Sequence, residues 1–330
     1  MRYRRFRNDD PPALAAIWNE SLLGRGAYQL RSSSVLDRFV FSKPYFEPEA
    51  LTVAEGDSGP VGFSLAGFGA SPDMASLDFE VGVTCAVVVR PEHRRRGVGT
   101  GLLRAGEAYL RARGARRLYA GPMEPHNPYG FGLYGGSGSP GFLCSDPAAA
   151  PFLEANGYVA DRTTLVFQRK LDQPINVVDS RFSQLRRRYA VDRLQEAAIS
   201  NWWRECMFAT TEPIEFRLED RLTRIPAARA LVWEMDGFSS KWNYPAAGLL
   251  DVQVRPDLRR LGLAKFLLSQ VLRYLQEQFF GIAEVQAQER NPAAVALLRS
   301  LGFEQVDVGR SYRLAADPGE PAGGPGAGEA

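Results

Sequence analysis

The fold is decided by the stretch Val89-Arg90-Pro91-Glu92-His93-Arg94-Arg95-Arg96-Gly97-Val98-Gly99, which returns 165 residues later as Val254-Arg255-Pro256-Asp257-Leu258-Arg259-Arg260-Leu261-Gly262-Leu263-Ala264. Each copy follows an apolar run and leads into a segment with helical apolar periodicity, so it predicts a strand, a glycine turn and a helix. The same offset relates Leu102 to Leu267 and Tyr109 to Tyr274 without a gap. The repeat indicates two domains of one fold in tandem.

Periodicity and turn residues extend this pattern along the chain. In the first half we expect a strand near Tyr3–Phe6, a helix through Leu14 and Ile17, and a hairpin of residues 51–54 and 61–66. We further expect strands at 83–89, 117–120 and 164–171, helices at 98–113 and 147–156, and a glycine-rich loop over 124–144. The second half is expected to contain strands at 188–191, 228–234, 249–254, 283–287 and near Tyr312, and helices at 194–208, 263–279 and 292–301.

The composition limits domain organisation and function class. With 330 residues, the chain is long enough for two cores, and we predict domains at 1–172 and 173–314 with a disordered tail at 315–330. The net charge of +2 gives no reason to expect a nucleic-acid partner, although Arg186-Arg187-Arg188 forms a local basic run. The three cysteines and the lack of a membrane-spanning apolar run favour a reduced, cytoplasmic protein without a membrane partner.

The glycine turns have the chemistry of a phosphate site. A glycine turn before a helix presents unpaired amides at the positive end of the helix dipole, which suits a phosphate-bearing ligand. The first turn follows a fourth strand and not a first one, which argues against a dinucleotide fingerprint. Neither copy continues with the Lys-Ser or Lys-Thr pair of a nucleoside triphosphatase loop.

Both turns fit the pattern (Gln/Arg)-x-x-Gly-x-(Gly/Ala), through Arg94–Gly99 and Arg259–Ala264, and therefore resemble the acetyl-CoA motif of the GNAT superfamily of N-acetyltransferases. The run Asn291–Phe303 also resembles the next motif of that family. The architecture is similar to tandem GNAT proteins of the mycothiol synthase type. The resemblance implies an α/β (α+β) fold of two GNAT-like domains, each a mixed, mostly antiparallel twisted sheet flanked by helices, with a splayed parallel pair that admits pantetheine.

The resemblance also implies the residues that bind acetyl-CoA, the co-substrate. In the family the pyrophosphate lies on the backbone amides of the turn, and small residues permit its close approach. We expect most arginine side chains of the turns to be exposed. The predicted cofactor-binding residues are Arg94, Arg95, Arg96, Gly97, Val98, Gly99, Thr100, Arg259, Arg260, Leu261, Gly262, Leu263, Ala264, Lys265 and Asn291.

The sequence says less about the proton-transfer groups. Asp251 is the candidate general base of the second half, and Glu80 or Asp78 is the candidate in the first. Where members of the family often have a tyrosine that acts as the general acid, this chain has Leu153 and Leu298. Tyr129 and Tyr134 could replace that acid in the first half, although packing of the glycine-rich loop is the simpler role.

Trp202, Trp203 and Phe208 are candidates for an acceptor cleft, with core packing expected for at least one tryptophan. No metal site is expected from two isolated histidines.

These observations predict an acyltransferase, specifically an acetyl-CoA-dependent N-acetyltransferase in which an amine attacks the thioester directly. The acceptor would be a small-molecule or peptide amine, and the second half is favoured as the catalytic one. The alternative is a non-catalytic acyl-CoA-binding or sensing protein with one or both halves degenerate, because both expected tyrosines are missing.

Overall fold

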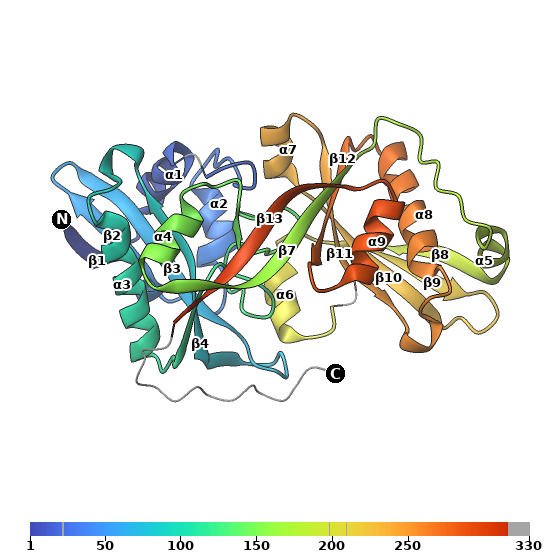
Figure 1. Ribbon diagram of the computed structural model, residues 1–330, viewed down its shortest axis with the longest axis horizontal. Helices are drawn as coiled ribbons and strands as arrows, with labels where there is room; N and C mark the ends of the chain where they lie inside the picture. Colours follow the sequence, from blue (N-terminus) through green and yellow to red (C-terminus); the bar gives the residue numbers. More distant parts are fainter. Residues whose placement is uncertain (22, 198, 209, 316–330) are drawn as a thin grey trace.

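The computed structural model describes residues 1–21, 23–197, 199–208 and 210–315, so the predicted disordered tail lies outside the described residues except for Ala315. The strands of these described residues join one continuous sheet, with the order β1-β2-β3-β4-β5-β13-β7-β12-β11-β10-β9-β8 and the short β6 paired to β13. Figure 1 shows the two halves side by side along this sheet, with β7 and β13 crossing between them. The described part of the chain therefore has the predicted mixed α/β fold.

The first half follows the predicted order of elements. Its strands are β1 (Arg2–Arg5), β2 (Leu51–Gly56), β3 (Gly59–Ala70), β4 (Leu77–Val89), β5 (Arg117–Ala120), β6 (Phe142–Leu143) and β7 (Tyr158–Lys170). Its helices are α1 (Pro11–Glu20), α2 (Ser34–Leu36), α3 (Val98–Ala112) and α4 (Ala149–Ala155), with short helical turns at η1 (Asp37–Phe41), η2 (Pro48–Ala50) and η3 (Pro91–His93). The long segment between β5 and α4 is a loop apart from β6, as its glycines predict.

The second half repeats this order with a different beginning. Its strands are β8 (Tyr189–Leu194), β9 (Ile214–Asp220), β10 (Pro226–Glu234), β11 (Ala246–Val254), β12 (Ile282–Gln288) and β13 (Glu304–Leu314). Its helices are α5 (Phe182–Arg188), α6 (Trp202–Phe208), α7 (Asp236–Trp242), α8 (Leu263–Glu277) and α9 (Pro292–Ser300), with the turn η4 (Pro256–Leu258). The prediction of one helix over 194–208 is wrong, because β8 extends to Leu194 and helix begins only at Trp202. The sequence also did not reveal α5, β9 or α7.

Each half contains one parallel strand pair that separates partway along its length. β4 pairs with β5 from Val81 to Thr84 and then continues to Val89 beyond the end of β5, still paired with β3 on its other edge. β11 pairs with β12 from Ala246 to Leu249 and continues to Val254. All other pairings in the described sheet are antiparallel. The splay predicted between the central parallel strands is therefore present in both halves.

The two halves exchange their closing strands. β13, from the end of the second half, pairs with β5 through Tyr312 and Ala120. β7, from the end of the first half, pairs with β12 along the whole length from Ile282 to Gln288. The two exchanged strands also pair with each other. The division into 1–172 and 173–314 stays a prediction based on sequence, and the sheet itself crosses that boundary.

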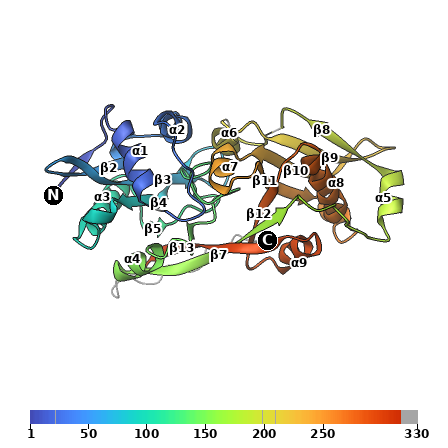
Figure 2. The ribbon, with the colours of Figure 1, turned by 90° about the horizontal axis from the view of Figure 1, so that it is seen from above.

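Helices cover both faces of the sheet and enclose the cores. Figure 2 shows α1 and α3 on opposite sides of β2 to β4. Each half has a large apolar core, and a third cluster lies where the halves meet. That cluster includes Phe131 of the first half and Trp203, Phe208, Trp233 and Phe238 of the second. None of the described helices is long and apolar enough to cross a membrane.

Candidate active site

The two glycine turns adopt the same backbone conformation. Gly97 and Gly262 have φ angles of 79° and 87°, and Arg95 and Arg260 also lie in the left-handed region at 60° and 67°. Such φ angles favour glycine, which explains the residue that the pattern requires at 97 and 262. The amides of Gly101 and Phe266 donate to the carbonyls of Gly97 and Gly262, at 2.9 Å in each case. The three amides before each of them lie in the first helical turn, where no intrahelical acceptor exists.

The surroundings of the two turns differ. At Gly97 a methyl group would meet no atom within 4 Å, so this turn is open. At Gly262 the same methyl group would lie 3.0 Å from Cζ of Arg181, which comes from the segment between the halves. The Asp179 carboxylate accepts two hydrogen bonds of 2.8 Å from Arg181 and lies 3.5 Å from Nζ of Lys265. The second turn is therefore covered by a carboxylate and its arginine.

The side chains of the predicted cofactor residues have different environments. Arg94 is directed inward, where its Nε donates to the carbonyl of Val89 at 3.0 Å, so this guanidinium supports the turn. Arg95, Arg96 and Thr100 are exposed, as is Leu261 in the second turn. Asn291 caps α9, because its Oδ1 accepts a hydrogen bond of 3.0 Å from the amide of Ala294. Their assignment to a cofactor stays a prediction.

The first half contains a cavity of about 560 Å³ that begins at Gly97 and Thr100 and follows the end of β4 along the edge that β5 does not cover. Beyond that strand its walls are apolar, with Leu14 and Trp18 from α1 and Leu36 and Val40 from the next segment. The charged residues among its described lining are Arg94, Arg95 and Asp146. The candidate bases Glu80 and Asp78 do not line it. They lie near the start of β4, where Glu80 is exposed and Asp78 is 3.6 Å from His126.

Three groups in the first cavity carry ionisable protons and are held neutral. Burial raises the pKa of the Cys85 thiol to about 12 and also raises the pKa of the Tyr129 and Tyr134 phenols. The Tyr134 hydroxyl accepts a hydrogen bond of 2.9 Å from the amide of Leu143, and Tyr129 packs against Tyr45. These contacts give both tyrosines a packing role in the glycine-rich loop.

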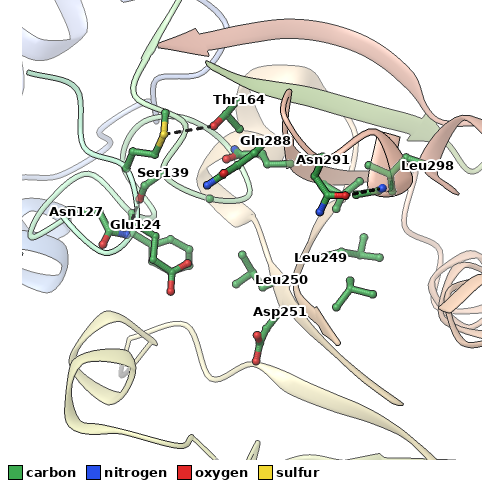
Figure 3. Close-up of a pocket in the computed structure, with 18 of the residues that line it drawn as sticks. Glu124, Asn127, Ser139, Thr164, Leu249, Leu250, Asp251, Gln288, Asn291 and Leu298 are labelled. Carbon is green, nitrogen blue, oxygen red and sulfur yellow. Dashed lines mark hydrogen bonds between the residues drawn. The ribbon is translucent and has the colours of Figure 1, made fainter. Parts of the chain in front are cut away.

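A larger cavity, of about 730 Å³, lies between the halves at the splay of β11 and β12. One wall consists of Leu249–Val252, residues 285–288 and the helices α8 and α9. The opposite wall comes from the first half, and Figure 3 shows Glu124, Asn127 and Ser139 facing β11 across the cavity. Trp203 and Phe208 line it as well as packing in the core, whereas Trp202 packs on Tyr45.

Asp251 stands in this cavity at a β-bulge. One extra residue of β11 lies between the pairs Leu231–Leu250 and Arg229–Gln253, and Asp251 there has a φ of 49°. Its carboxylate is 2.8 Å from Nη1 of Arg204 and also bonds Arg229. Burial alone would raise the pKa of this carboxyl, but the two guanidinium groups outweigh it and hold the pKa below the usual value. A carboxylate held in this way is a weak base.

Glu124 is the second carboxylate of the cavity, and the sequence did not single it out. Its Oε1 accepts a hydrogen bond of 3.1 Å from Nη2 of Arg204, so Arg204 bridges Glu124 and Asp251. The Glu124 side chain is 53% exposed, against 4% for Asp251, and is therefore the carboxylate that a ligand can reach. The signal available in the sequence was the long ordered loop, which we attributed to the first half alone.

Two buried polar atoms of this cavity lack a hydrogen-bond partner among the described residues. They are Oδ1 of Asn127 and Nε1 of Trp203, on residues that are 5% and 1% exposed. An unpaired buried acceptor or donor is costly, and a bound polar ligand would satisfy it. Leu298 lines the same cavity, so the position of the expected tyrosine is aliphatic there, as Leu153 is in the first cavity.

The sequence matches the model of the acetyltransferase (GNAT) family over residues 5–135 and 196–303. Curated relatives from Escherichia coli strain K12 and Salmonella typhimurium, named as alanine N-acetyltransferases of ribosomal protein bS18, are 33% identical over 76 residues. This alignment covers 23% of the chain, and the chain spans about half the length, 51%, of these relatives.

Solved structures share the complete two-half arrangement. A tandem GNAT protein from the clavulanic acid biosynthesis pathway has a TM-score of 0.65 at 17% identity, covering 97% of this chain and 99% of its own. A GCN5-related N-acetyltransferase from Sphaerobacter thermophilus has a TM-score of 0.63 at 15% identity, covering 94% of each chain. At these identities the likeness concerns the fold.

Proposed function

Since the chain belongs to the acetyltransferase (GNAT) family and is an acyltransferase, we propose that it transfers an acetyl group from acetyl-CoA to an amine in the cavity between its halves. The observation that carries this proposal is the reachable carboxylate of Glu124, which faces the splay of β11 and β12 beside two unpaired buried polar atoms. A base, a polar acceptor site and an opening between strands thus meet in one place.

The residues around the second turn fit the cofactor. Free amides at the start of α8 would hold the pyrophosphate, since Gly262 and Ala264 allow close approach. The separated ends of β11 and β12 would admit the pantetheine arm, beside Asn291 and Leu298 of the α9 segment. When bound, acetyl-CoA supplies an acetyl group that is activated as a thioester.

The protein's own groups would then hold the acceptor and manage its proton. An acceptor enters as an ammonium ion and must lose a proton before its nitrogen can attack. Glu124 would take that proton, because it is half exposed and pairs with one arginine that Asp251 shares, whereas the buried Asp251 pairs with two. Asn127 and Trp203 would bind polar groups of the acceptor through Oδ1 and Nε1. Asp251 would position Arg204, and Arg204 in turn Glu124.

The test is Glu124→Gln, assayed with acetyl-CoA and a panel of amines that includes a peptide beginning with alanine, small polyamines and amino sugars. We expect kcat to fall by about 10²–10⁴-fold and the pH dependence attributable to the base to disappear. Calorimetry should show unchanged cofactor binding. Glu80→Gln, an exposed carboxylate outside both cavities, is the matched control and should keep full activity.

The results separate the competing functions. If Glu124→Gln retains the parental kcat and pH profile, Glu124 is not the base. If the parent binds acetyl-CoA but acetylates no amine of the panel, the non-catalytic binding function is the better description. That function is already favoured for the first half, where the 165-residue offset places Ala86 at the position of Asp251.

A further inference from the structure

We propose that the cavity of the first half binds an acyl-CoA whose acyl chain is longer and more apolar than acetyl, and holds that chain without transferring it. This proposal depends on the proposed function only in that the first glycine turn takes the same CoA group. It concerns a different cavity, whose walls and charges differ from those of the cavity between the halves.

The cavity is continuous from the turn to an apolar end. Gly97 and Thr100 line its entrance, where the turn is open, and Cys85 to Val89 of β4 line its middle. The far end is lined by aliphatic and aromatic side chains of the first core: Leu14, Leu36, Val40, Phe63, Leu65 and Leu133. A chain attached to CoA at the turn could thus extend along β4 into apolar surroundings, and each buried methylene would strengthen binding.

An amine is a poor occupant of this end. The charged lining residues Arg94, Arg95 and Asp146 belong to the turn and to the segment before α4, and Arg94 acts electrostatically on Asp146. In the cavity between the halves, Asp251 and Glu124 both line the wall, whereas the position in β4 that corresponds to Asp251 is Ala86. A buried ammonium would have no carboxylate partner at the apolar end among the described lining residues, and an unpaired buried charge is strongly unfavourable.

The same contrast argues against transfer. Attack on a thioester requires an amine that has lost its proton, and hence a base within reach. The ionisable side chains beside the apolar end are Cys85, Tyr129 and Tyr134, which are buried and stay protonated at neutral pH. The acyl chain would therefore lie beside no group of the described lining that could remove a proton from an attacking amine.

The experiment titrates free CoA, acetyl-CoA and octanoyl-CoA into the full-length protein and into Gly97→Glu and Gly262→Glu by calorimetry. We expect one site that binds octanoyl-CoA at least about tenfold more tightly than acetyl-CoA, since octanoyl adds about six methylenes. Gly97→Glu should abolish this preference and Gly262→Glu should retain it. Gly262→Glu, in which only the first turn is open, should form no octanoyl amide with any amine of the panel.

Two variants probe the path along β4 that leads to the apolar end. Cys85→Phe narrows this middle part of the cavity, and Ala86→Asp places there, at a partly exposed position, a carboxylate that corresponds to Asp251 of the second half. Both should weaken octanoyl-CoA binding at least fivefold and leave acetyl-CoA binding unchanged, while thermal unfolding verifies that each variant is folded.

The outcomes distinguish this proposal from the proposed function. Equal affinities for octanoyl-CoA and acetyl-CoA, or a preference that Gly97→Glu does not remove, would overturn the inference while acetyl transfer stands. Octanoyl amide formation by Gly262→Glu would overturn the claim that the chain is held without transfer. Failure to bind any CoA ester would refute both proposals.

Discussion

Lys43 is a buried lysine of the first half whose Nζ atom contacts the second half. Its Nζ donates to the carbonyl of Met207 at 3.3 Å and also to that of Cys206, both in the last turn of α6. A cation at this end of a helix satisfies carbonyls that have no intrahelical donor. Burial nevertheless disfavours the charge and lowers the pKa of Lys43 to about 8. One residue of the first half thus completes a helix that lines the cavity between the halves.

This lowered pKa predicts a pH dependence of stability. Between pH 8 and 9.5 the unfolded chain keeps the proton on Lys43 while the folded protein loses it, so the unfolded state binds more protons and stability rises with pH. We expect Lys43 to contribute a rise of about 1–2 kcal/mol over this window. Chemical denaturation of Lys43→Met at several pH values should lack that rise, whereas the exposed control Lys170→Met should keep it. Parallel pH curves for Lys43→Met and the parent would contradict the pKa of Lys43.

Single residues were only partly predictable. The pattern of the turns required glycine at 97 and 262, and the structure gives the reason as a positive φ. Asp251, the candidate base of the second half, lies in the cavity at the splay and its role stays a prediction, while its partner Arg204 lies 47 positions earlier in the sequence and Glu124 comes from the other half. Spacing along a chain reports contacts within an element, so it could not reveal a carboxylate pair bridged by a distant arginine.

At the scale of elements, the segment that precedes α5 covers the second turn. Asp179 occupies a position beside Arg181 and Lys265, two cations that a phosphate group at the turn would also attract. The hydrogen bonds from Arg181 are the main cause that lowers the pKa of the Asp179 carboxyl, so it remains charged well into the acidic range. This carboxylate therefore competes with the cofactor for the same cations.

Asp179→Asn should relieve that competition. We expect acetyl-CoA to bind the second turn about three- to tenfold more tightly, because Arg181 and Lys265 become available to the phosphates. Calorimetry in a Gly97→Glu background isolates this turn. Asp172→Asn makes the same change of charge at an exposed residue of the same segment and should leave the affinity unaltered. Weaker binding in Asp179→Asn would mean that Asp179 builds the turn and does not compete for it.

Elements with strong internal periodicity were predicted well, and those that depend on tertiary contacts were not. The helices α3 and α8 begin at their predicted residues because a glycine turn and an apolar stripe mark them. The helix expected over 194–208 is present only as α6, from Trp202 to Phe208, and its first residue, Leu194, ends β8. Periodicity over a short window indicated a strand at 188–191 but could not reveal how far that strand extends along its partner β9.

The whole molecule is held together by the exchange of β7 and β13. To separate the halves, the ladders of β5 with β13, β13 with β7 and β7 with β12 must all break. The cluster around Phe131 and Trp203 would lose its packing as well. The tandem repeat in the sequence predicted two similar domains, but a repeat contains no information about which sheet receives each closing strand. This part of the architecture could be seen only in three dimensions.

The exchange predicts that a cut between the halves does not release them. A protease site inserted between Gln173 and Pro174, both exposed, would allow the link to be severed in the folded protein. We expect the two fragments to elute together in size-exclusion chromatography and to separate only in denaturant, because the ladders do not depend on the linker. Fragments that elute separately in native buffer would show that the strand exchange does not hold the halves together.

The exchanged strands also bear on how such a chain can change over time. A duplicated domain is usually free to be lost once its twin performs the reaction. Here the loss of the first half would leave β12 without its neighbour β7 and the cavity between the halves without one wall. We therefore expect a truncated gene to encode a second half with an incomplete sheet and an open cavity. The first half is needed as scaffold whatever its own cavity binds, so substitutions that line only that cavity would leave the wall between the halves intact.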